Sequence, residues 1–149
     1  VTDFETFDGR NENIDRARIR GVELGYGYRG EHWHLRAEAS FNDPRNRNTG
    51  EHLLRRASDT WVLAVERRSG RLELGADASR SGRRYDFGFP SAVALQPYTL
   101  VNLSARFIVN NRWSLQARVD NLLDERYQLA YGYNSARRSL LIASRYRFN

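Results

Sequence analysis

Residues 33–40 read WHLRAEAS, a stretch in which apolar and polar side chains alternate without a break. The same strict alternation returns at residues 72–79 (LELGADAS) and 113–120 (WSLQARVD). With 40% apolar residues, about 0.7% of eight-residue windows alternate in this way by chance, which is about one in a chain of this length. Three occur, and residues 101–107 add a seven-residue example. This pattern predicts β-strands that each carry one apolar face.

Weaker alternation between these stretches predicts their partner strands. Residues 22–28 and 61–65 place apolar side chains at every second position, and Leu140, Ile142, Tyr146 and Phe148 line one side of the last segment. A further strand is expected to end near Phe7. These segments add up to about eight strands, and no segment has the 3.6-residue period of a helix. The sequence therefore predicts an all-β, antiparallel, up-and-down arrangement.

The predicted connections alternate between short and long. The short, turn-like ones are residues 29–32, 67–71 and 109–112. The long, polar ones are residues 42–52, 80–97 and 121–138, and they hold all three prolines. Short connections at one end of a sheet and long loops at the other are typical of outer-membrane β-barrels, whose turns are periplasmic and whose loops are extracellular.

The aromatic residues of the apolar face are expected near the two ends of the strands. Trp33 and Phe41 bound one apolar stretch and are eight residues apart, which is roughly 26 Å along a strand. That length, once tilted, fits an apolar band between two aromatic girdles. We therefore predict a lipid-facing surface. Its members are Trp33, Leu35, Phe41, Trp61, Leu63, Leu74, Val101, Leu103, Phe107, Trp113, Leu115, Val119, Leu140, Ile142, Tyr146 and Phe148.

The opposite face is ionic, with residues such as Arg36, Glu38, Asp77 and Arg106. Burying these charges in a dry core would cost several kcal/mol for each unpaired ion. A soluble sandwich or lipocalin-like barrel, with the apolar face inside and the charged face outside, explains the alternation equally well. It does not predict the unequal connections or the aromatic bands.

Three motifs resemble those of one protein family. Residues 119–127, VDNLLDERY, resemble the signature that ends the penultimate barrel strand of TonB-dependent outer-membrane receptors. Residues 18–23, RIRGVE, resemble another strand of that family, and the chain closes on the alternating aromatics Tyr146 and Phe148, as the family's terminal strand does. The motifs keep the order and spacing of the last third of such receptors.

Two further segments are similar to the cobalamin (vitamin B12) receptor subgroup of this family: residues 53–57, LLRRA, and residues 131–137, YGYNSAR. The resemblance implies import of a large, scarce nutrient, with cobalamin or another corrinoid as the candidate. Substrate contacts would come from the long loops and the upper lumen. The aromatic candidates there are Tyr131 and Tyr133 first, and then Tyr85, Phe87 and Tyr98.

The resemblance also implies a bacterial outer-membrane location and a 22-stranded barrel, of which residues 1–149 would be the C-terminal part. Val1 is neither Met nor the start of a secretory leader, so we expect a processed chain or a piece of a longer one. The plug domain and the TonB-contacting segment would lie in the missing N-terminal region. The expected partners are TonB through that region, the barrel-assembly machinery through the last strand, and outer-membrane lipid. Lipopolysaccharide phosphates would pair with loop-end arginines, namely Arg16, Arg18, Arg20, Arg55 and Arg56.

Other functions receive less support from the residues. His32 and His34 share a strand face, but no third ligand lies near them in the sequence, so we predict no metal site and no cofactor. No nucleophile motif is present, so we predict no enzyme; a lipid hydrolase remains the enzymatic alternative. The formal net charge of +6 comes from 24 arginines interleaved with 18 acids, which does not favour nucleic acid as a partner. A self-contained eight-stranded barrel with a structural or adhesive role also remains open.

Overall fold

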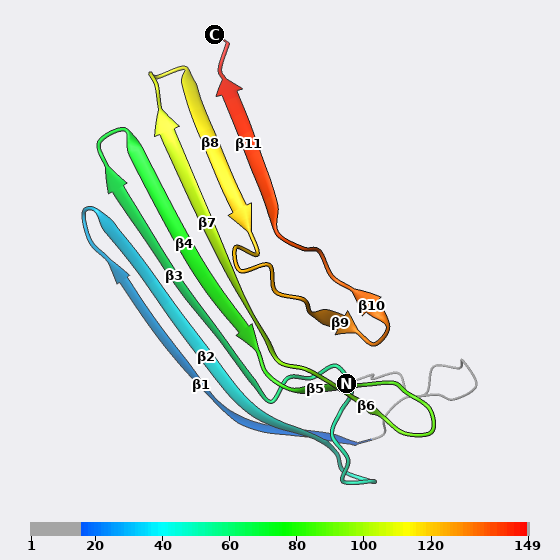
Figure 1. Cartoon of the computed structure of the whole chain (residues 1–149). Coiled ribbons are helices and arrows are strands. Elements are labelled where there is room, and N and C mark those ends of the chain that lie inside the picture. Colours follow the sequence, from blue (N-terminus) through cyan, green and yellow to red (C-terminus); the bar gives the residue numbers. More distant parts are fainter. Residues whose placement is uncertain (1–15, 149) are drawn as a thin grey trace.

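The computed structural model describes residues 16–148, which form eleven strands and no helix. Seven long strands lie side by side in one layer (Figure 1). They are β1 (Ala17–Arg29), β2 (Trp33–Asn46), β3 (Asp59–Ser69), β4 (Leu72–Ser81), β7 (Tyr98–Ile108), β8 (Trp113–Asp120) and β11 (Ser139–Tyr146). Every neighbouring pair in this sheet is antiparallel. The all-β antiparallel prediction is confirmed, and the strand predicted to end near Phe7 lies outside the described residues.

The unequal connections are observed as predicted. The three hairpin turns lie at one end of the sheet, where residues 30–32, 70–71 and 109–112 join the strands, and the long connections lie at the other end (Figure 1). Gly70 adopts a left-handed φ of 57°, which a two-residue hairpin requires and which glycine allows without steric cost. Two of the long connections contain small two-stranded sheets. These are β5 (Arg84–Asp86) with β6 (Val93–Leu95), and β9 (Gln128–Ala130) with β10 (Tyr133–Asn134).

The first long connection was predicted too long. The sequence placed its start at Asn42, but β2 continues to Asn46, because residues 42–46 pair in register with residues 17–21 of β1. Alternation stops at Asn42, whereas backbone pairing continues. Pro44 lies within this extension, and its carbonyl accepts a hydrogen bond from the Leu53 amide at 3.0 Å. β2 therefore ends at Asn46, opposite Ala17, where β1 begins.

The register aligns the apolar side chains of all seven strands on one face. Leu63 lies opposite Ala37 on β2 and opposite Ala78 on β4, and Leu103 lies opposite Ala76 and Val119. Every residue of the predicted lipid-facing surface falls on this face or, for Phe148, continues it and packs edge-on against Tyr146 with ring centroids 4.8 Å apart. We call this face the outer face. The geometry therefore gathers the predicted set on one surface.

The outer face has no second layer packed against it within residues 16–148. Leu35, Leu74 and Leu115 are 38–43% exposed, whereas a soluble sandwich would seal them. The buried hydrophobic core of the described residues consists of Leu53 and Leu95, which both belong to the long connections, and Pro44 is buried at the loop end of β2. The sheet itself therefore has no dry core.

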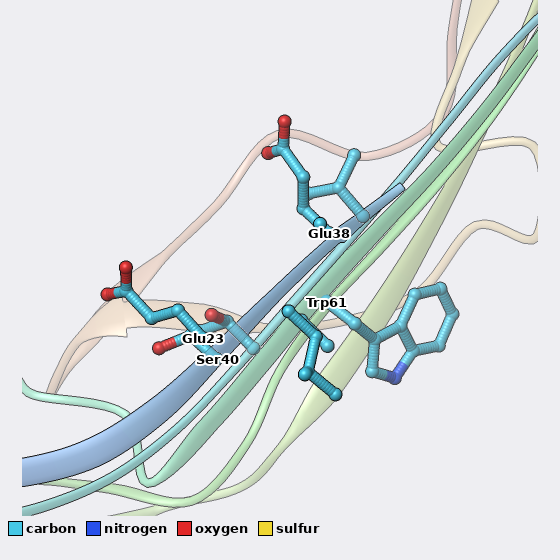
Figure 2. A pocket seen from close by; sticks show the side chains of 9 residues that line it. Glu23, Glu38, Ser40 and Trp61 are labelled. Atoms are coloured by element: carbon cyan, nitrogen blue, oxygen red, sulfur yellow. The ribbon is translucent and has the colours of Figure 1, made fainter. Parts of the chain in front are cut away.

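The other face, which we call the polar face, carries charged groups that pair across strands. Figure 2 shows the separation near a hollow in the sheet, where Glu23, Glu38 and Ser40 extend from one side of the strands and the Trp61 indole extends from the other. Three of the polar-face contacts link neighbouring strands. They are Arg106 with Glu73 at 3.4 Å, Asn102 with Asp77 at 2.7 Å, and His34 with Glu66 at 3.7 Å. Such pairs suit a wet surface.

Residues 16–148 contain no helix that is long and apolar enough to cross a membrane.

Two adjacent residues on β3 test which face meets lipid. Leu63→Arg places a charge in the middle of the outer face, and we expect it to destabilise the folded protein in a bilayer by about 2–4 kcal/mol. Val62→Arg places the same charge on the polar face, opposite Glu38 and Ser79, and is expected to change stability by less than about 1 kcal/mol. Reversible urea unfolding of the full-length protein in lipid vesicles measures both. Equal losses for the two variants would contradict the assignment of the faces.

Candidate functional site

The three long connections converge on β5, at the end of the sheet opposite the hairpin turns (Figure 1). Alternation within this short strand sends Arg84 and Asp86 to one side and Tyr85 to the other. Arg84 and Asp86 are 6% and 2% exposed, and they are two of the few buried charged or polar side chains among the described residues. We call the residues joined through β5 the loop cluster, and we take it as the candidate functional site.

Asp86 joins all three connections through its carboxylate. One oxygen, Oδ1, accepts hydrogen bonds from the Arg55 Nε at 2.7 Å and from the Phe87 amide at 2.8 Å. The other, Oδ2, accepts a hydrogen bond from the Tyr131 amide at 2.7 Å. The Arg55 amide also donates to the carbonyl of Tyr85 at 2.6 Å. Asp86 is therefore the common acceptor for residues that lie 31 and 45 positions away in the chain.

The same contacts set the ionisation of this carboxyl. Burial alone raises the pKa of Asp86, but the hydrogen bonds from Tyr131, Arg55 and Phe87 outweigh it, so the pKa lies below its usual value of 3.8. Because hydrogen bonds to the charged form favour ionisation, Asp86 is an anion at neutral pH. A buried anion with three donors holds the loops together more tightly than a neutral acid would.

Arg84 connects β5 to the third long connection. Its Nη2 donates to the Gln128 carbonyl at 2.8 Å, and its Nη1 lies 3.3 Å from the Ser81 hydroxyl. The guanidinium also lies over the Tyr98 ring, 4.9 Å from the centroid, and the Tyr98 and Tyr127 rings are 4.4 Å apart. The Nε of Arg84 has no hydrogen-bond partner in the described residues. The cation–π contact with Tyr98 therefore helps to stabilise the buried guanidinium.

The five predicted substrate-contacting aromatics divide into two groups. Tyr98 and Tyr85 are partly buried and pack against other side chains: Tyr98 against Arg84, and Tyr85 stacked on His52 with ring centroids 5.2 Å apart. Phe87, Tyr131 and Tyr133 present their side chains outward and are 45–75% exposed. The backbones of Phe87 and Tyr131 are both fixed to Asp86. The cluster thus presents exposed aromatic rings on a backbone that hydrogen bonds to Asp86 hold in place. Such rings can stack against a large ligand.

The turn after β8 is built around Asn121, which is 5% exposed and has a left-handed φ of 51°. Its side-chain oxygen accepts from the Glu125 amide at 2.8 Å, and its Nδ2 donates to the Glu125 carbonyl at 2.9 Å. Its own amide donates to Asn102 Oδ1 at 2.9 Å. Asparagine tolerates the left-handed region and supplies both a donor and an acceptor, which is why it suits this position of the VDNLLDERY motif.

An ion pair fastens the other end of this connection. Asp124 forms a salt bridge and hydrogen bonds with Arg137 and accepts a further hydrogen bond from the Arg138 amide at 3.1 Å. The Arg137 contact and the Arg138 amide hold the pKa of Asp124 well below its usual range, and Asp124 in turn raises the pKa of Arg137. Between the two ends, Gly132 takes a φ of 81° in the two-residue turn between β9 and β10, so Tyr131 and Tyr133 lie on either side of Gly132 in a tight hairpin.

Sequence reasoning missed the centre of this site. Asp86 and Arg84 have no local motif, and their roles arise only when three distant connections meet. Arg55 was predicted as a lipopolysaccharide contact, but in the structure its Nε binds Asp86, although its side chain stays 64% exposed. The segments 53–57 and 131–137, noted separately in the sequence, are joined through Asp86. Among the described residues, no group of three or more His, Cys, Asp and Glu side chains is arranged to hold a metal ion.

Comparisons with known proteins match both the sequence and the fold. Residues 1–122 match the family described as "TonB dependent receptor-like, beta-barrel". The chain is 28% identical over 136 residues to the vitamin B12 transporter BtuB of Photobacterium profundum, and 31% identical over 119 residues to BtuB of Vibrio vulnificus. These alignments cover 91% and 80% of this chain but 22% and 19% of the relatives. The chain therefore spans about a fifth of the length of the curated relatives it matches.

The fold is similar to that of a solved structure with low sequence identity. The ferric-catecholate import receptor Fiu of E. coli superimposes with a TM-score of 0.78 at 18% identity, over 97% of this chain and 23% of that receptor. At this identity the likeness concerns the fold alone.

Removing the charge of Asp86 tests the centre of the loop cluster. In Asp86→Asn, we expect a local loss of about 1–3 kcal/mol, because Arg55 loses its anionic partner and one backbone donor loses its acceptor. Hydrogen exchange in the full-length protein should become faster at Arg55, Phe87 and Tyr131 and stay unchanged in β3. Exchange in the loops that matches the wild-type protein would contradict the role of Asp86.

The lowered pKa of Asp86 also predicts a pH dependence. The stabilisation is complete above the usual value of 3.8 and is lost as the pH falls from there toward the folded-state pKa. Protection of the Tyr131 amide, relative to β3, should therefore be constant near neutrality and fall below about pH 4. In Asp86→Asn this acid-dependent component should be absent, and its persistence would assign the effect to another group.

Asn121 tests the turn after β8. Asn121→Ala removes the side-chain hydrogen bonds and leaves a residue with a Cβ at positive φ, so we expect a loss of about 2–3 kcal/mol in the stability of residues 121–138. Asn121→Gly accepts the backbone angle and lacks the hydrogen bonds, so its loss should be smaller. Chemical denaturation and exchange in residues 121–138 compare the two. If both variants lose the same amount, the left-handed backbone contributes nothing.

Proposed function

We propose a function from the premise that this chain belongs to the TonB-dependent receptor β-barrel family. In this proposal the chain forms the C-terminal part of the wall of a barrel that imports a large, scarce nutrient. Membership in the family confirms the resemblance found in the sequence and the outer-membrane location in Gram-negative bacteria. The family is one of transporters and receptors. In this proposal the outer face contacts lipid and the polar face lines the aqueous lumen.

Cobalamin or another corrinoid is the nutrient class that we propose. The observation that carries this choice is the meeting of two segments similar to cobalamin receptors, residues 53–57 and 131–137, at the carboxylate of Asp86. The two relatives with 28% and 31% identity are vitamin B12 transporters, which supports the same choice. A corrin ring is large and conjugated, so exposed rings such as Tyr131 and Tyr133 offer it stacking surfaces.

Iron chelates are the second candidate ligands, because the Fiu receptor has a similar fold and its name assigns ferric-catecholate import. Its 18% identity is below the 28% and 31% of the B12 transporters, so it gives this candidate less support. The outward-facing aromatics would contact a corrinoid in the first case and an iron chelate in the second. A direct binding measurement with each ligand distinguishes the two candidates.

The proposed partners follow from the proposed function as an outer-membrane receptor. TonB would engage a segment outside residues 1–149, in the complete receptor. The barrel-assembly machinery would recognise β11, which pairs only with β8 among the described residues and leaves its other edge open. Lipopolysaccharide would meet loop-end arginines such as Arg16, Arg20 and Arg56, which form no ion pair with any described residue.

The test uses the full-length receptor in detergent, with cyanocobalamin and a ferric catecholate as probes. We expect saturable binding of cyanocobalamin, weakened about tenfold by the double variant Tyr131→Ala/Tyr133→Ala, since stacking contributes about 1–1.5 kcal/mol. Tyr26→Ala on the outer face serves as the matched control and should bind normally. Binding of the ferric catecholate alone would overturn the cobalamin assignment, and normal binding by the double variant would remove these tyrosines from the site.

A further inference from the structure

Arg67 is an unusual residue on the outer face. It lies on β3, two residues before the strand ends at the hairpin turn, opposite Trp33 on β2 and Leu74 on β4. Its guanidinium lies over the Trp33 ring, 5.3 Å from the centroid. It forms no ion pair with any residue of the described range 16–148. A cation without a counter-charge at the edge of an apolar surface calls for an external anion.

Two other arginines show the contrast. Arg80 also lies on the outer face, opposite Trp61 at the loop end, but it has a carboxylate partner, Asp59, at 3.6 Å. Arg68 follows Arg67 directly, lies on the polar face, and pairs with Glu73 at 3.8 Å. Of these three, Arg67 alone has an aromatic ring in place of an acid.

An apolar groove begins beside Arg67. A hollow of about 500 Å³ is lined by Trp33, Arg67 and Leu74 at one end and by Ala76, Ala105 and Ala117 further along. Its volume is within the range of about 300–1,000 Å³ that is typical of small-molecule sites. The alanines make the groove, because their short side chains lie between larger ones such as Leu103 on the neighbouring strands.

A second hollow continues the first. It has a volume of about 370 Å³, shares Val65 and Ala76 with the first, and extends to Leu63 and Val101. Together the two hollows, which we call the alanine groove, run from Arg67 at the hairpin end into the middle of the outer face. A long, unbranched hydrocarbon chain fits this shape, and a cation at its open end fits the phosphate of the same molecule.

We propose that the alanine groove and Arg67 form a specific phospholipid site, in which Arg67 binds the phosphate and the groove holds an acyl chain. Hairpin turns of outer-membrane barrels face the periplasm, so the occupant is a glycerophospholipid of the periplasmic leaflet rather than lipopolysaccharide. Trp33 holds the guanidinium in place through its ring face. The proposal does not depend on which nutrient the receptor imports.

The test measures lipid retained by the full-length receptor after extraction in mild detergent. Native mass spectrometry during titration with phosphatidylglycerol should show one lipid that binds more tightly than the others. Arg67→Gln should weaken that binding about tenfold, as expected for loss of one charge-assisted contact. Arg68→Gln, one residue away on the polar face, and Arg80→Gln, on the outer face with its own acid, should leave it unchanged.

A groove-filling variant tests the acyl chain separately. Ala76→Leu occupies the point shared by the two hollows and keeps the outer face apolar, so we expect lipid retention to fall while nutrient binding stays normal. The proposal is overturned if the wild-type receptor retains no phospholipid, if Arg67→Gln and Arg68→Gln retain it equally, or if lipid A is retained in its place.

Discussion

The register between antiparallel strands is the constraint on which the rest of the structure depends. Because side chains alternate with a period of two, a slip of one residue would exchange the two faces of a strand. The register instead places Leu63 opposite Ala37 and Ala78, which are also outer-face residues. The same pairing of outer-face residues with one another holds from β1 to β11. Backbone groups paired in this way are also satisfied without water, so the same ladder that separates the faces makes the sheet compatible with hydrocarbon.

The distribution of buried side chains follows from that constraint. A sheet between lipid and water needs no dry core, and the buried leucines and buried charged residues of the described chain lie in the long connections, around Leu53, Arg84 and Asp86. Asp86 is held by donors from three connections, so the loop cluster has a defined shape at the end that a nutrient would reach. Rigid loops reduce the entropy lost on ligand binding, which links the buried carboxylate to the proposed function.

Residues 33–40 were enough to predict strand character, because each outer-face side chain meets the same medium regardless of its neighbours. The end of β2 was not predictable in the same way, since pairing with β1 carries it past the last alternating residue. Asp86 could not be found from sequence, because its partners Arg55 and Tyr131 are 31 and 45 residues distant and no local pattern marks it. Asn121 was recognised as part of a motif, and the structure gives the physical reason: a left-handed backbone with both side-chain ends bonded.

The assignment of the outer face to lipid and the polar face to water is tested most directly by single spin labels along β3 in bilayers. The 149 residues contain no cysteine, so labels can be introduced one at a time at positions 61 to 66. The account predicts that labels at 61, 63 and 65 are accessible to oxygen dissolved in lipid, and that labels at 62, 64 and 66 are accessible to a water-soluble nickel complex. Equal accessibility at all six positions, or the reverse alternation, would contradict it.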